Sequence, residues 1–332
     1  MKAVVMTAVG GPEVLQYQDA ADPVIRRDTE ILVRLEAAGV NPLDTKLRSK
    51  GTYYPGTSPP ILGCDGAGVV AAVGNAVHRF KVDDAVYFCN GGIGDAPGTY
   101  AQYAVVDEAF VAPKPVTLDF SAAAAVPLAL ITAWESLLDR GKLQTGQSVL
   151  IHAGAGGVGH LAIQIAKNAG AWVCTTVGSA AKANFVRDLG VDEAILYRDK
   201  DFTQAVLDWS EGDGVELALD TIGGDTFVKT FGAVRFYGDL ITLLQPDPST
   251  DWTLARQRNL RIVFELMLTP MVAKLRERQS RQAEILTQAT RLFDTGKLRV
   301  HVERCYPLAE AAQAHRDLAR GGMTGKLVLA ID

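Results

Sequence analysis

The spacing of hydrophobic residues changes at about Gln147 of the 332-residue chain. Beyond that point, apolar runs of strand length alternate with stretches in which apolar residues recur at helical spacing. The expected strands are SVLIHA, AWVCTTV, EAILYR, VELALDTI, YGDLITLL and LRIVFELML, and the expected helices are VGHLAIQIAKNAG, AAKANFVRDLG, FTQAVLDWS and DTFVKTFGAV. Strands joined by helical crossovers predict an α/β domain, in which a doubly wound parallel sheet carries helices on both faces.

The segments on either side have a different texture. Up to about Val126 the chain is rich in Gly, Pro and β-branched residues, and runs such as EILVRLEAAGV predict short strands in a partly closed β structure. Towards the C-terminus, Thr269 is expected to cap a helix with Pro270 at its first position and Gly296 at its end. A strand near VHVERCYPL, a helix through AEAAQAHRDLARGG and a strand KLVLAID follow. These elements do not extend the alternating pattern, so we expect them to return to the first domain.

Composition narrows the class of protein. The 33 basic and 38 acidic residues give a net charge of -5, which argues against nucleic-acid binding. The N-terminus lacks a signal-peptide pattern, and no apolar run approaches the roughly 20 residues of a membrane span. We therefore expect a cytoplasmic protein without membrane association. Cys64, Cys89, Cys174 and Cys305 are widely spaced, which fits a reducing compartment and argues against a clustered structural zinc site.

A glycine-rich loop follows the first strand of the alternating region. Gly154, Gly156 and Gly159 fit the pattern G-x-G-x-x-G. In that pattern the first glycine permits a tight turn, the second admits a pyrophosphate close to the backbone, and the third lets the helix pack against the strand. Free N–H groups at the helix N-terminus then face the phosphates. A glycine-rich structural turn is the alternative, but the strand before the loop and the helix after it favour dinucleotide binding.

The end of the next strand indicates which dinucleotide binds. NAD sites place an acidic residue roughly 20 residues beyond the loop, where it holds the ribose 2′-hydroxyl. The matching stretch TTVGSAAK has no acid, but it has Ser179 as a donor and Lys182 in the first turn of a helix. The helix dipole disfavours a cation there unless an anion lies nearby, so we expect the 2′-phosphate of NADPH. The alternative for Lys182 is an ordinary solvated lysine.

Several motifs carry a family resemblance. AAGVNPLDTKLRSKGTYY, GCDGAGVVAAVG, AAAAVPLALITAWESL, HAGAGGVG and TGKLVLAI span essentially the whole chain. Together they resemble the zinc-independent, zeta-crystallin-like quinone oxidoreductases of the medium-chain dehydrogenase/reductase superfamily. The resemblance implies a GroES-like catalytic domain over residues 1–123 and 269–332 and a Rossmann NADPH-binding domain over residues 124–268. It also implies NADPH, a cleft between the domains, and usually a homodimer or homotetramer.

The resemblance also bears on metal binding. In the zinc-dependent alcohol dehydrogenases of the superfamily, the positions of Asn41 and Cys64 hold a cysteine and a histidine ligand, and the third ligand falls near Leu128. A catalytic zinc needs three N, S or carboxylate ligands, and neither Asn41 nor Leu128 can serve. The segment GGIGDAPGTYAQY also lacks the four cysteines of the structural zinc lobe. We therefore expect no metal, with Cys64 as a small buried hydrophobe.

Residue by residue, the resemblance implies roles around the cofactor. Asn41 resembles the amide that hydrogen-bonds the nicotinamide ribose or the substrate oxygen, and Thr132 resembles the hydroxyl near the carboxamide. Tyr197 resembles the tyrosine near the 2′-phosphate, although such a strand-end tyrosine is also an ordinary packing residue. Lys326 is expected to reach the pyrophosphate or to cap the domain junction. The other expected cofactor contacts are Gly154, Gly156, Gly157, Val158 and Gly159 in the loop, and Ile222, Gly223, Leu243 and Leu244 at strand ends.

Without a metal, an acceptor that delocalises its own charge is favoured, such as a quinone or an activated alkene. The protein then supplies orientation, dry walls and one or two hydrogen-bond donors. We expect Asn41 and one of Tyr53 and Tyr54 to donate to the acceptor oxygen, while the other tyrosine packs. His152, placed in a strand, and His160, on a helix face, are expected to be structural. No side chain is a convincing general acid, so we expect solvent to protonate the product.

Three functions stay open at this point. An NADPH-dependent quinone oxidoreductase is favoured over an NADPH-dependent reductase of enones or acrylates. The third is a non-catalytic NADPH-binding protein with a structural, sensory or nucleic-acid-binding role. For assembly, LRIVFELML is an apolar strand at the expected sheet edge, and an uncovered edge favours a two-fold partner. We expect a homodimer, the alternative being that the tail helices cover this edge.

Overall fold

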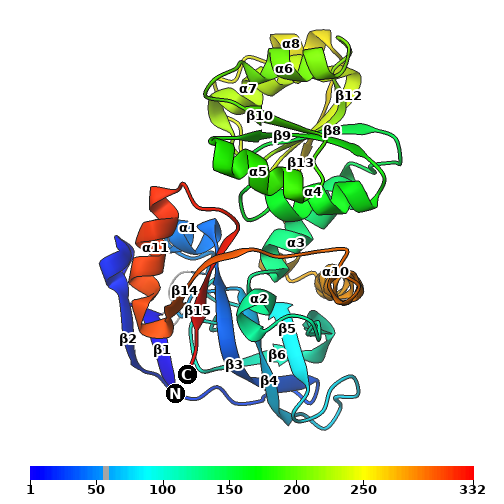
Figure 1. The fold of residues 1–332 in the computed structure, drawn as a ribbon. Helices are drawn as coiled ribbons and strands as arrows, with labels where there is room; N and C mark the ends of the chain where they lie inside the picture. Colours follow the sequence, from blue (N-terminus) through cyan, green and yellow to red (C-terminus); the bar gives the residue numbers. More distant parts are fainter. Residues whose placement is uncertain (55–59) are drawn as a thin grey trace. The chain divides into compact units, whose positions relative to one another are not determined.

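The chain divides into two compact units. The computed structural model describes residues 1–54 and 60–332. One unit consists of residues 1–128 and 268–332, and the other consists of residues 129–267 (Figure 1). Each unit has its own large sheet, and the first unit also has a two-stranded sheet of β1 (Lys2–Met6) and β2 (Leu15–Asp19). Each unit is described by itself below.

The unit of residues 129–267 is built on a six-stranded parallel sheet. Its strands are β8 (Ser148–Ile151), β9 (Trp172–Val177), β10 (Glu193–Leu196), β11 (Val215–Asp220), β12 (Val234–Thr242) and β13 (Arg261–Phe264). Their spatial order is β10-β9-β8-β11-β12-β13. Numbered along the chain this is the order 3-2-1-4-5-6 of the Rossmann fold, so the predicted doubly wound sheet is confirmed.

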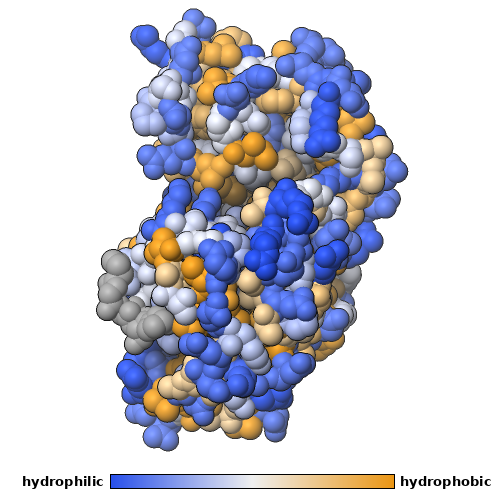
Figure 2. Space-filling view, turned by 90° about the vertical axis from the view of Figure 1, so that its left-hand side faces the viewer, coloured by the Kyte–Doolittle hydropathy of each residue, from blue (hydrophilic) through white to orange (hydrophobic). Residues whose placement is uncertain are grey.

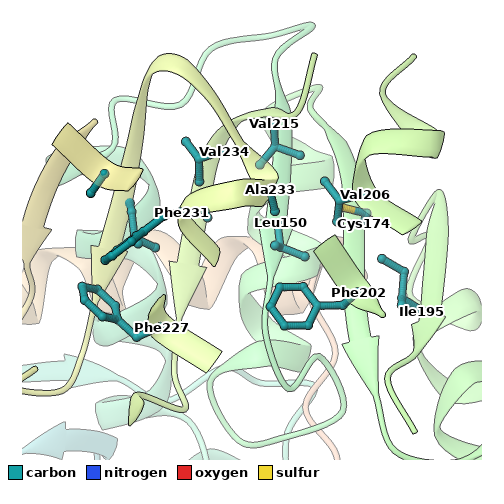
Figure 3. Packing of buried hydrophobic residues seen from close by; sticks show 13 residues of the cluster. Leu150, Cys174, Ile195, Phe202, Val206, Val215, Phe227, Phe231, Ala233 and Val234 are labelled. Carbon is teal, nitrogen blue, oxygen red and sulfur yellow. The ribbon is translucent and has the colours of Figure 1, made fainter. Parts of the chain in front are cut away.

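Helices cover both faces of this sheet, as the crossover pattern predicts. In Figure 1, α4 (Gly159–Asn168) and α5 (Ala180–Asp188) lie on one face, and α6 (Phe202–Trp209), α7 (Gly224–Ala233) and α8 (Thr253–Gln257) lie on the other. Phe202 from α6 and Phe227 and Phe231 from α7 are buried against Leu150 and other sheet residues (Figure 3). The rings of Phe227 and Phe231 meet edge to face with centroids 5.0 Å apart. Truncating one such phenylalanine to alanine costs about 3 to 5 kcal/mol, so this cluster holds the helices to the sheet.

The other unit joins both ends of the chain in one mixed sheet. The strands are β3 (Glu30–Val40), β4 (Asp65–Val73), β5 (Ala85–Cys89), β6 (Tyr103–Asp107), β7 (Val111–Pro113), β14 (Val302–Pro307) and β15 (Lys326–Ala330). The order is β14-β15-β3-β4-β5-β7, and β6 pairs with β3. The C-terminal β15 runs antiparallel beside β3, from Leu327 opposite Val40 to Ala330 opposite Ala37. The C-terminal segment therefore returns to the N-terminal domain, as predicted.

Helices of this unit depart from the sequence expectations at three places, and one of them is α2 (Phe120–Ala124), which was not predicted. The helix α1 (Pro42–Lys50) was not predicted, because its segment PLDTKLRSK has no clear apolar periodicity; Pro42 at its first turn starts it. The expected helix from Thr269 to Gly296 is two helices, α9 (Thr269–Val272) and α10 (Arg276–Asp294). Thr269 is the first residue of α9 and not its cap, and Lys274 with φ of 55° interrupts the helical backbone.

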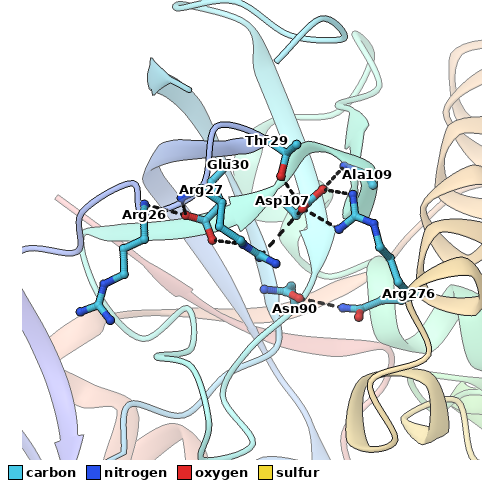
Figure 4. A network of polar contacts seen from close by, with 9 residues as sticks. Arg26, Arg27, Thr29, Glu30, Asn90, Asp107, Ala109 and Arg276 are labelled. Carbon is cyan, nitrogen blue, oxygen red and sulfur yellow. Dashed lines mark hydrogen bonds and ion pairs between the residues drawn. The ribbon is translucent and has the colours of Figure 1, made fainter. Parts of the chain in front are cut away.

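A polar network anchors the start of α10 to the sheet (Figure 4). The Arg276 guanidinium donates to the two oxygens of Asp107 at 2.6 and 2.9 Å, and Thr29 donates to the same carboxylate at 2.8 Å. Burial raises the pKa of Asp107, but these hydrogen bonds outweigh it and hold the pKa below its ordinary value. Further along α10, the buried hydroxyl of Tyr87 on β5 donates to the Leu286 carbonyl at 2.6 Å.

The outer surface mixes polar and apolar side chains. On the face drawn in Figure 2, hydrophobic residues form small groups separated by hydrophilic ones. Over residues 1–54 and 60–332, no helix combines the length and the apolarity needed to cross a bilayer.

Candidate functional site

The glycine loop leaves β8 through a left-handed residue that is not glycine. Ala153 has φ of 51°, and the Gly156 N–H closes the turn on the Ala153 carbonyl at 2.8 Å. A Cβ on Gly154 would lie 2.1 Å from Oγ1 of Thr175 on β9. A Cβ on Gly159 would lie 2.3 Å from the Ala153 oxygen. The first glycine is therefore required for close packing on β9 and not for the turn itself, whereas the third has the packing role that the pattern predicts.

The second glycine has more open surroundings. A Cβ on Gly156 would meet only the Ala153 oxygen, at 3.2 Å. Just beyond it, the N–H groups of Gly157, Val158 and Gly159 donate no hydrogen bond to any described residue. They lie at the N-terminus of the ten-residue helix α4, where the helix dipole favours negative charge. This part of the loop fits a phosphate group, with its oxygens bound by backbone N–H groups.

The residues expected at the 2′-phosphate come together at the carboxyl ends of β9 and β10. Ser179 is the N-cap of α5, and its hydroxyl accepts the Lys182 N–H at 3.4 Å. Tyr197 follows β10, is 49% exposed, and has its hydroxyl 2.9 Å from the position of a Cβ on Gly178. The Ser179 hydroxyl and the Tyr197 phenol thus border one short stretch of loop, which leads into the helical turn of Lys182, and the segment TTVGSAAK has no carboxylate.

The strand-end residues of β11 and β12 also meet. A Cβ on Gly223, whose φ is 76°, would lie 2.8 Å from the Leu244 side chain. The buried carboxylate of Asp220 accepts the N–H groups of Ile222 and Gly223 at 3.0 and 2.9 Å, and Thr242 donates to it at 2.8 Å. Ile222 is 48% exposed, and the Leu243 N–H donates to the Asp220 carbonyl at 3.1 Å. Asp220 was missed by sequence reasoning, although an acid at the end of an apolar strand is a usable signal.

In the unit of residues 1–128 and 268–332, Asn41 lies in a buried charged cluster. Asn41 Nδ2 donates to Asp65 Oδ2 at 2.9 Å, and the Lys326 ammonium donates to Asn41 Oδ1. Lys326 Nζ is also 3.3 Å from the Val40 carbonyl and 3.7 Å from Asp65 Oδ2. The Leu128 N–H donates to the other oxygen of Asp65 at 2.8 Å. Lys326 is only 3% exposed, and the structure places its ammonium inside this cluster, where Asn41 and Asp65 are its neighbours.

A second buried acid, Asp44, adjoins this cluster and was also missed. Its Oδ2 accepts the Asn41 N–H at 2.8 Å and the Tyr100 hydroxyl at 3.0 Å, while its Oδ1 has no hydrogen-bond partner among residues 1–54 and 60–332. Burial raises the pKa of the Asp44 carboxyl to about 7, against the opposing effect of these hydrogen bonds. Tyr100 in turn lies 3.2 Å from Nε2 of His315, whose pKa burial lowers to about 3. A carboxyl that changes charge near neutral pH therefore lies beside the backbone of Asn41.

The two expected tyrosines have different environments. The Tyr54 hydroxyl donates to the Val272 carbonyl, and the Lys274 ammonium lies over its ring at 5.0 Å from the centroid. Tyr53 is 44% exposed, and its N–H donates to the Ile93 carbonyl at 3.0 Å. Tyr54 thus packs within its own domain, whereas Tyr53 presents its side chain to solvent. Thr132, expected near the carboxamide, is 6% exposed and belongs to the other unit.

The histidines of the glycine-loop region are held by internal contacts. His152 follows β8 directly and does not lie within it; its ring nitrogens are 3.0 Å from Thr176 Oγ1 and 2.8 Å from Thr230 Oγ1. Burial lowers the pKa of His152 to about 4, although Asp220 opposes this effect. His160 Nδ1 is 2.8 Å from the Gly156 carbonyl. Neither ring is arranged as an acid or base towards a ligand.

Cys64 is a buried free thiol that donates to the Gly91 carbonyl at 3.1 Å. A hydrogen bond from Cys89 lowers the pKa of Cys64, but burial and the neighbouring carboxylates raise it overall. In the part of the chain that the structure describes, no three His, Cys, Asp or Glu side chains gather closely enough to hold a metal ion.

Comparisons with known proteins identify the family. The model for the alcohol dehydrogenase GroES-like domain matches residues 27–116, and the model for zinc-binding dehydrogenases matches residues 189–329. A quinone oxidoreductase of Pseudomonas aeruginosa is 34% identical over 99% of both chains.

Solved structures agree with this result. An alcohol dehydrogenase superfamily protein from Novosphingobium aromaticivorans has a TM-score of 0.91 and 34% identity, and all of both chains is covered. A quinone oxidoreductase from Escherichia coli, solved in complex with NADPH, has a TM-score of 0.87 and 28% identity, with 99% of this chain and 100% of that chain covered. The chain therefore belongs to the quinone oxidoreductases of the medium-chain dehydrogenase/reductase superfamily.

Proposed function

We propose that this protein is an NADPH-dependent quinone oxidoreductase. The observation that carries the cofactor assignment is the group of Ser179, Lys182 and Tyr197 beside a loop without a carboxylate. The Escherichia coli relative solved with NADPH supports the same cofactor. The quinone assignment rests on the Pseudomonas aeruginosa relative, which matches over nearly its whole length.

In this proposal, residues of the unit 129–267 bind different parts of NADPH. The free N–H groups of residues 157–159 bind the pyrophosphate, and Gly156 leaves room for it. Ser179 donates to the 2′-phosphate, and the Lys182 ammonium neutralises part of its charge. The exposed ends of β11 and β12, held by Asp220, border the nicotinamide half of the cofactor. NADPH, when bound, supplies the hydride.

We further propose that acceptor reduction needs no zinc. The oxygen of the Asn41 amide accepts a hydrogen bond from the Lys326 ammonium, so it is a poor ligand for a metal cation. One N–H of the Asn41 amide donates a hydrogen bond to Asp65. In this proposal the second N–H donates to the oxygen of the quinone. The exposed Tyr53 is the second donor of this proposal, since the Tyr54 hydroxyl is bonded to Val272.

The proposal is tested by NADPH oxidation against a panel of acceptors after exhaustive chelation. The panel pairs an ortho-quinone with an enone and an acrylate ester, and NADH is measured beside NADPH. We expect the quinone to give the highest kcat/KM with NADPH. Turnover restricted to the alkenes would move the protein to the second class of reductase, and tight NADPH binding without any turnover would refute an enzymatic role.

A single substitution tests the cofactor site within the same assay. Ser179→Asp keeps a residue that caps helices well but places a carboxylate where the 2′-phosphate is expected. We expect the kcat/KM ratio of NADPH to NADH to fall about tenfold or more, because like charges repel and the carboxylate accepts from the ribose hydroxyl of NADH. Ser179→Asn is the matched control, since it keeps the cap without adding charge. An unchanged ratio in Ser179→Asp would place the 2′-phosphate elsewhere.

A further inference from the structure

Asn41 has charged side chains at both ends of its amide. Lys326 donates to Oδ1, and Nδ2 donates to Asp65 at 2.9 Å. The three side chains come from distant parts of the chain, namely the residue before α1, the start of β4 and the start of β15. All three are at most 3% exposed, so solvent does not compete for these bonds.

This arrangement fixes which way the amide points. An ammonium has only donors and a carboxylate has only acceptors. A flipped amide would turn its NH₂ group against Lys326 and its oxygen against Asp65, and would lose both bonds. In a buried cluster, each lost bond removes one of the few partners of a charged group, which costs more than the same loss at a surface. One orientation of Asn41 is therefore strongly preferred.

The contact with Asp65 leaves one donor of Asn41 free, and the contact with Lys326 strengthens that donor. Asn41 Nδ2 carries two hydrogens, and Asp65 is its only acceptor among the described residues. Donation from a cation to the amide oxygen draws electron density from the nitrogen, because hydrogen bonds in a chain polarise one another. The Lys326 contact therefore makes the second N–H of Asn41 a better donor than it would be without that cation.

We propose that Lys326 and Asp65 are positioning residues that hold and polarise the Asn41 amide so that its second N–H is presented to the carbonyl oxygen of the acceptor. This inference rests on the proposed function for the identity of the acceptor. It assigns Lys326 to the acceptor side of the reaction and not to the cofactor pyrophosphate. The acceptor class that it favours has a carbonyl oxygen on which negative charge develops during reduction.

The first experiment separates an acceptor role from a cofactor role. In Lys326→Met, we expect kcat with the quinone to fall about tenfold or more, since a misplaced donor loses its effect, while the dissociation constant of NADPH changes less than about twofold. Lys46→Met, at an exposed lysine of α1, is the control for loss of one positive charge. A large rise in the NADPH dissociation constant with kcat unchanged would overturn the proposal in favour of a pyrophosphate contact.

A double-mutant cycle tests whether Lys326 acts through Asn41. In an Asn41→Ala background, we expect Lys326→Met to lower kcat by less than about twofold, because the residue that it positions is gone. If Lys326→Met lowers kcat as much in the Asn41→Ala background as in wild type, the proposal is overturned. Lys326→Met leaves the Asp65 carboxylate without its cation, so Asp65→Asn/Lys326→Met provides a charge-neutral variant if the single variant does not fold. In that variant kcat is expected to stay low although the melting temperature recovers.

A readout without turnover keeps this proposal separate from the proposed function. The six asparagines are Asn41, Asn75, Asn90, Asn168, Asn184 and Asn259, so ¹⁵N-asparagine labelling gives six side-chain amide signals, and Asn41→Ala identifies one of them. We expect the hydrogens of the Asn41 amide to exchange slowly with water and its signal to shift strongly in Lys326→Met. An unmoved signal would overturn the proposal that Lys326 holds the Asn41 amide. The signal could move although the wild-type protein reduces neither quinones nor activated alkenes. In that case Lys326 does hold the Asn41 amide, but the proposed function is overturned, and with it the role of this amide towards an acceptor.

Discussion

At the residue scale, the glycines of the loop have different reasons to be glycine. A Cβ added to Gly159 would lie 2.3 Å from the Ala153 oxygen, whereas a Cβ added to Gly156 would lie 3.2 Å from its nearest neighbour. We expect Gly159→Ala to lower the free energy of unfolding by about 2 kcal/mol or more through overpacking. Gly156→Val is expected to change stability less but to weaken NADPH binding, because its side chain occupies the phosphate space. Denaturant unfolding and fluorescence titration measure the two effects, and equal losses of stability would contradict the distinction.

Asp44 makes stability depend on pH in a defined direction. Its pKa is 3.8 in an unfolded chain and about 7 in the folded protein, so the folded state keeps a proton that the unfolded state has lost between about pH 4 and 7. The contribution of Asp44 to stability is therefore complete below this interval and is lost as the pH rises through it. We expect the loss between pH 5 and pH 8 to be smaller in Asp44→Asn than in wild type by about 3 kcal/mol. Urea unfolding at both pH values checks this, and an identical pH dependence would contradict a protonated Asp44.

The sequence predicts the glycine loop and Ser179, because both depend on residues close together in the chain. It does not predict the contacts of Lys326, because its partners Asn41 and Asp65 are brought to it only by the pairing of β15 with β3 and of β3 with β4. An acid inside the apolar motif GCDGAGVV is a sign of a buried charge. Its partner can be identified only when the register of the strands is known.

At the scale of elements, Asp220 joins the carboxyl ends of β11 and β12 in the six-stranded parallel sheet, which we call the cofactor sheet. Its carboxylate accepts hydrogen bonds from Ile222, Gly223 and Thr242. We expect Asp220→Ala to lower the free energy of unfolding by about 2 kcal/mol or more, because it leaves buried donors unsatisfied, and to weaken NADPH binding. Asp213→Ala, at an exposed aspartate before β11, is the control. Unfolding curves that superimpose for the two variants would contradict the role given to Asp220.

The elements that the sequence predicts well are those with a clear period. The six strands of the parallel sheet and the four predicted helices between them are confirmed to within a few residues, whereas α8 between β12 and β13 was not predicted. Two other departures have physical reasons. Helix α1 is mostly polar, so its start is marked by Pro42 and not by an apolar stripe. The break before α10 occurs at Lys274, a residue type that rarely adopts a left-handed backbone and so gives no warning in the sequence.

At the scale of the whole molecule, the free edge of the cofactor sheet favours self-association. Among the described strands, β13 pairs only with β12, and its Phe264 is 57% exposed. We therefore expect a homodimer formed through this edge. Light scattering at micromolar concentration should give twice the 35.5 kDa mass of the chain. A monomer under these conditions, or a dimer that Phe264→Lys leaves intact, would contradict pairing through β13.

The central claim is that this protein passes a hydride from NADPH to a quinone without zinc. The most direct measurement is a single-turnover reaction of the chelated protein with NADPH deuterated at C4 and an ortho-quinone, followed anaerobically by stopped flow. The account predicts one hydroquinone for each NADPH consumed and a slower step with the deuterated cofactor, since the C–H bond breaks in that step. NADPH that binds but stays reduced in the presence of the quinone, or oxidation that returns only when zinc is added, would contradict it.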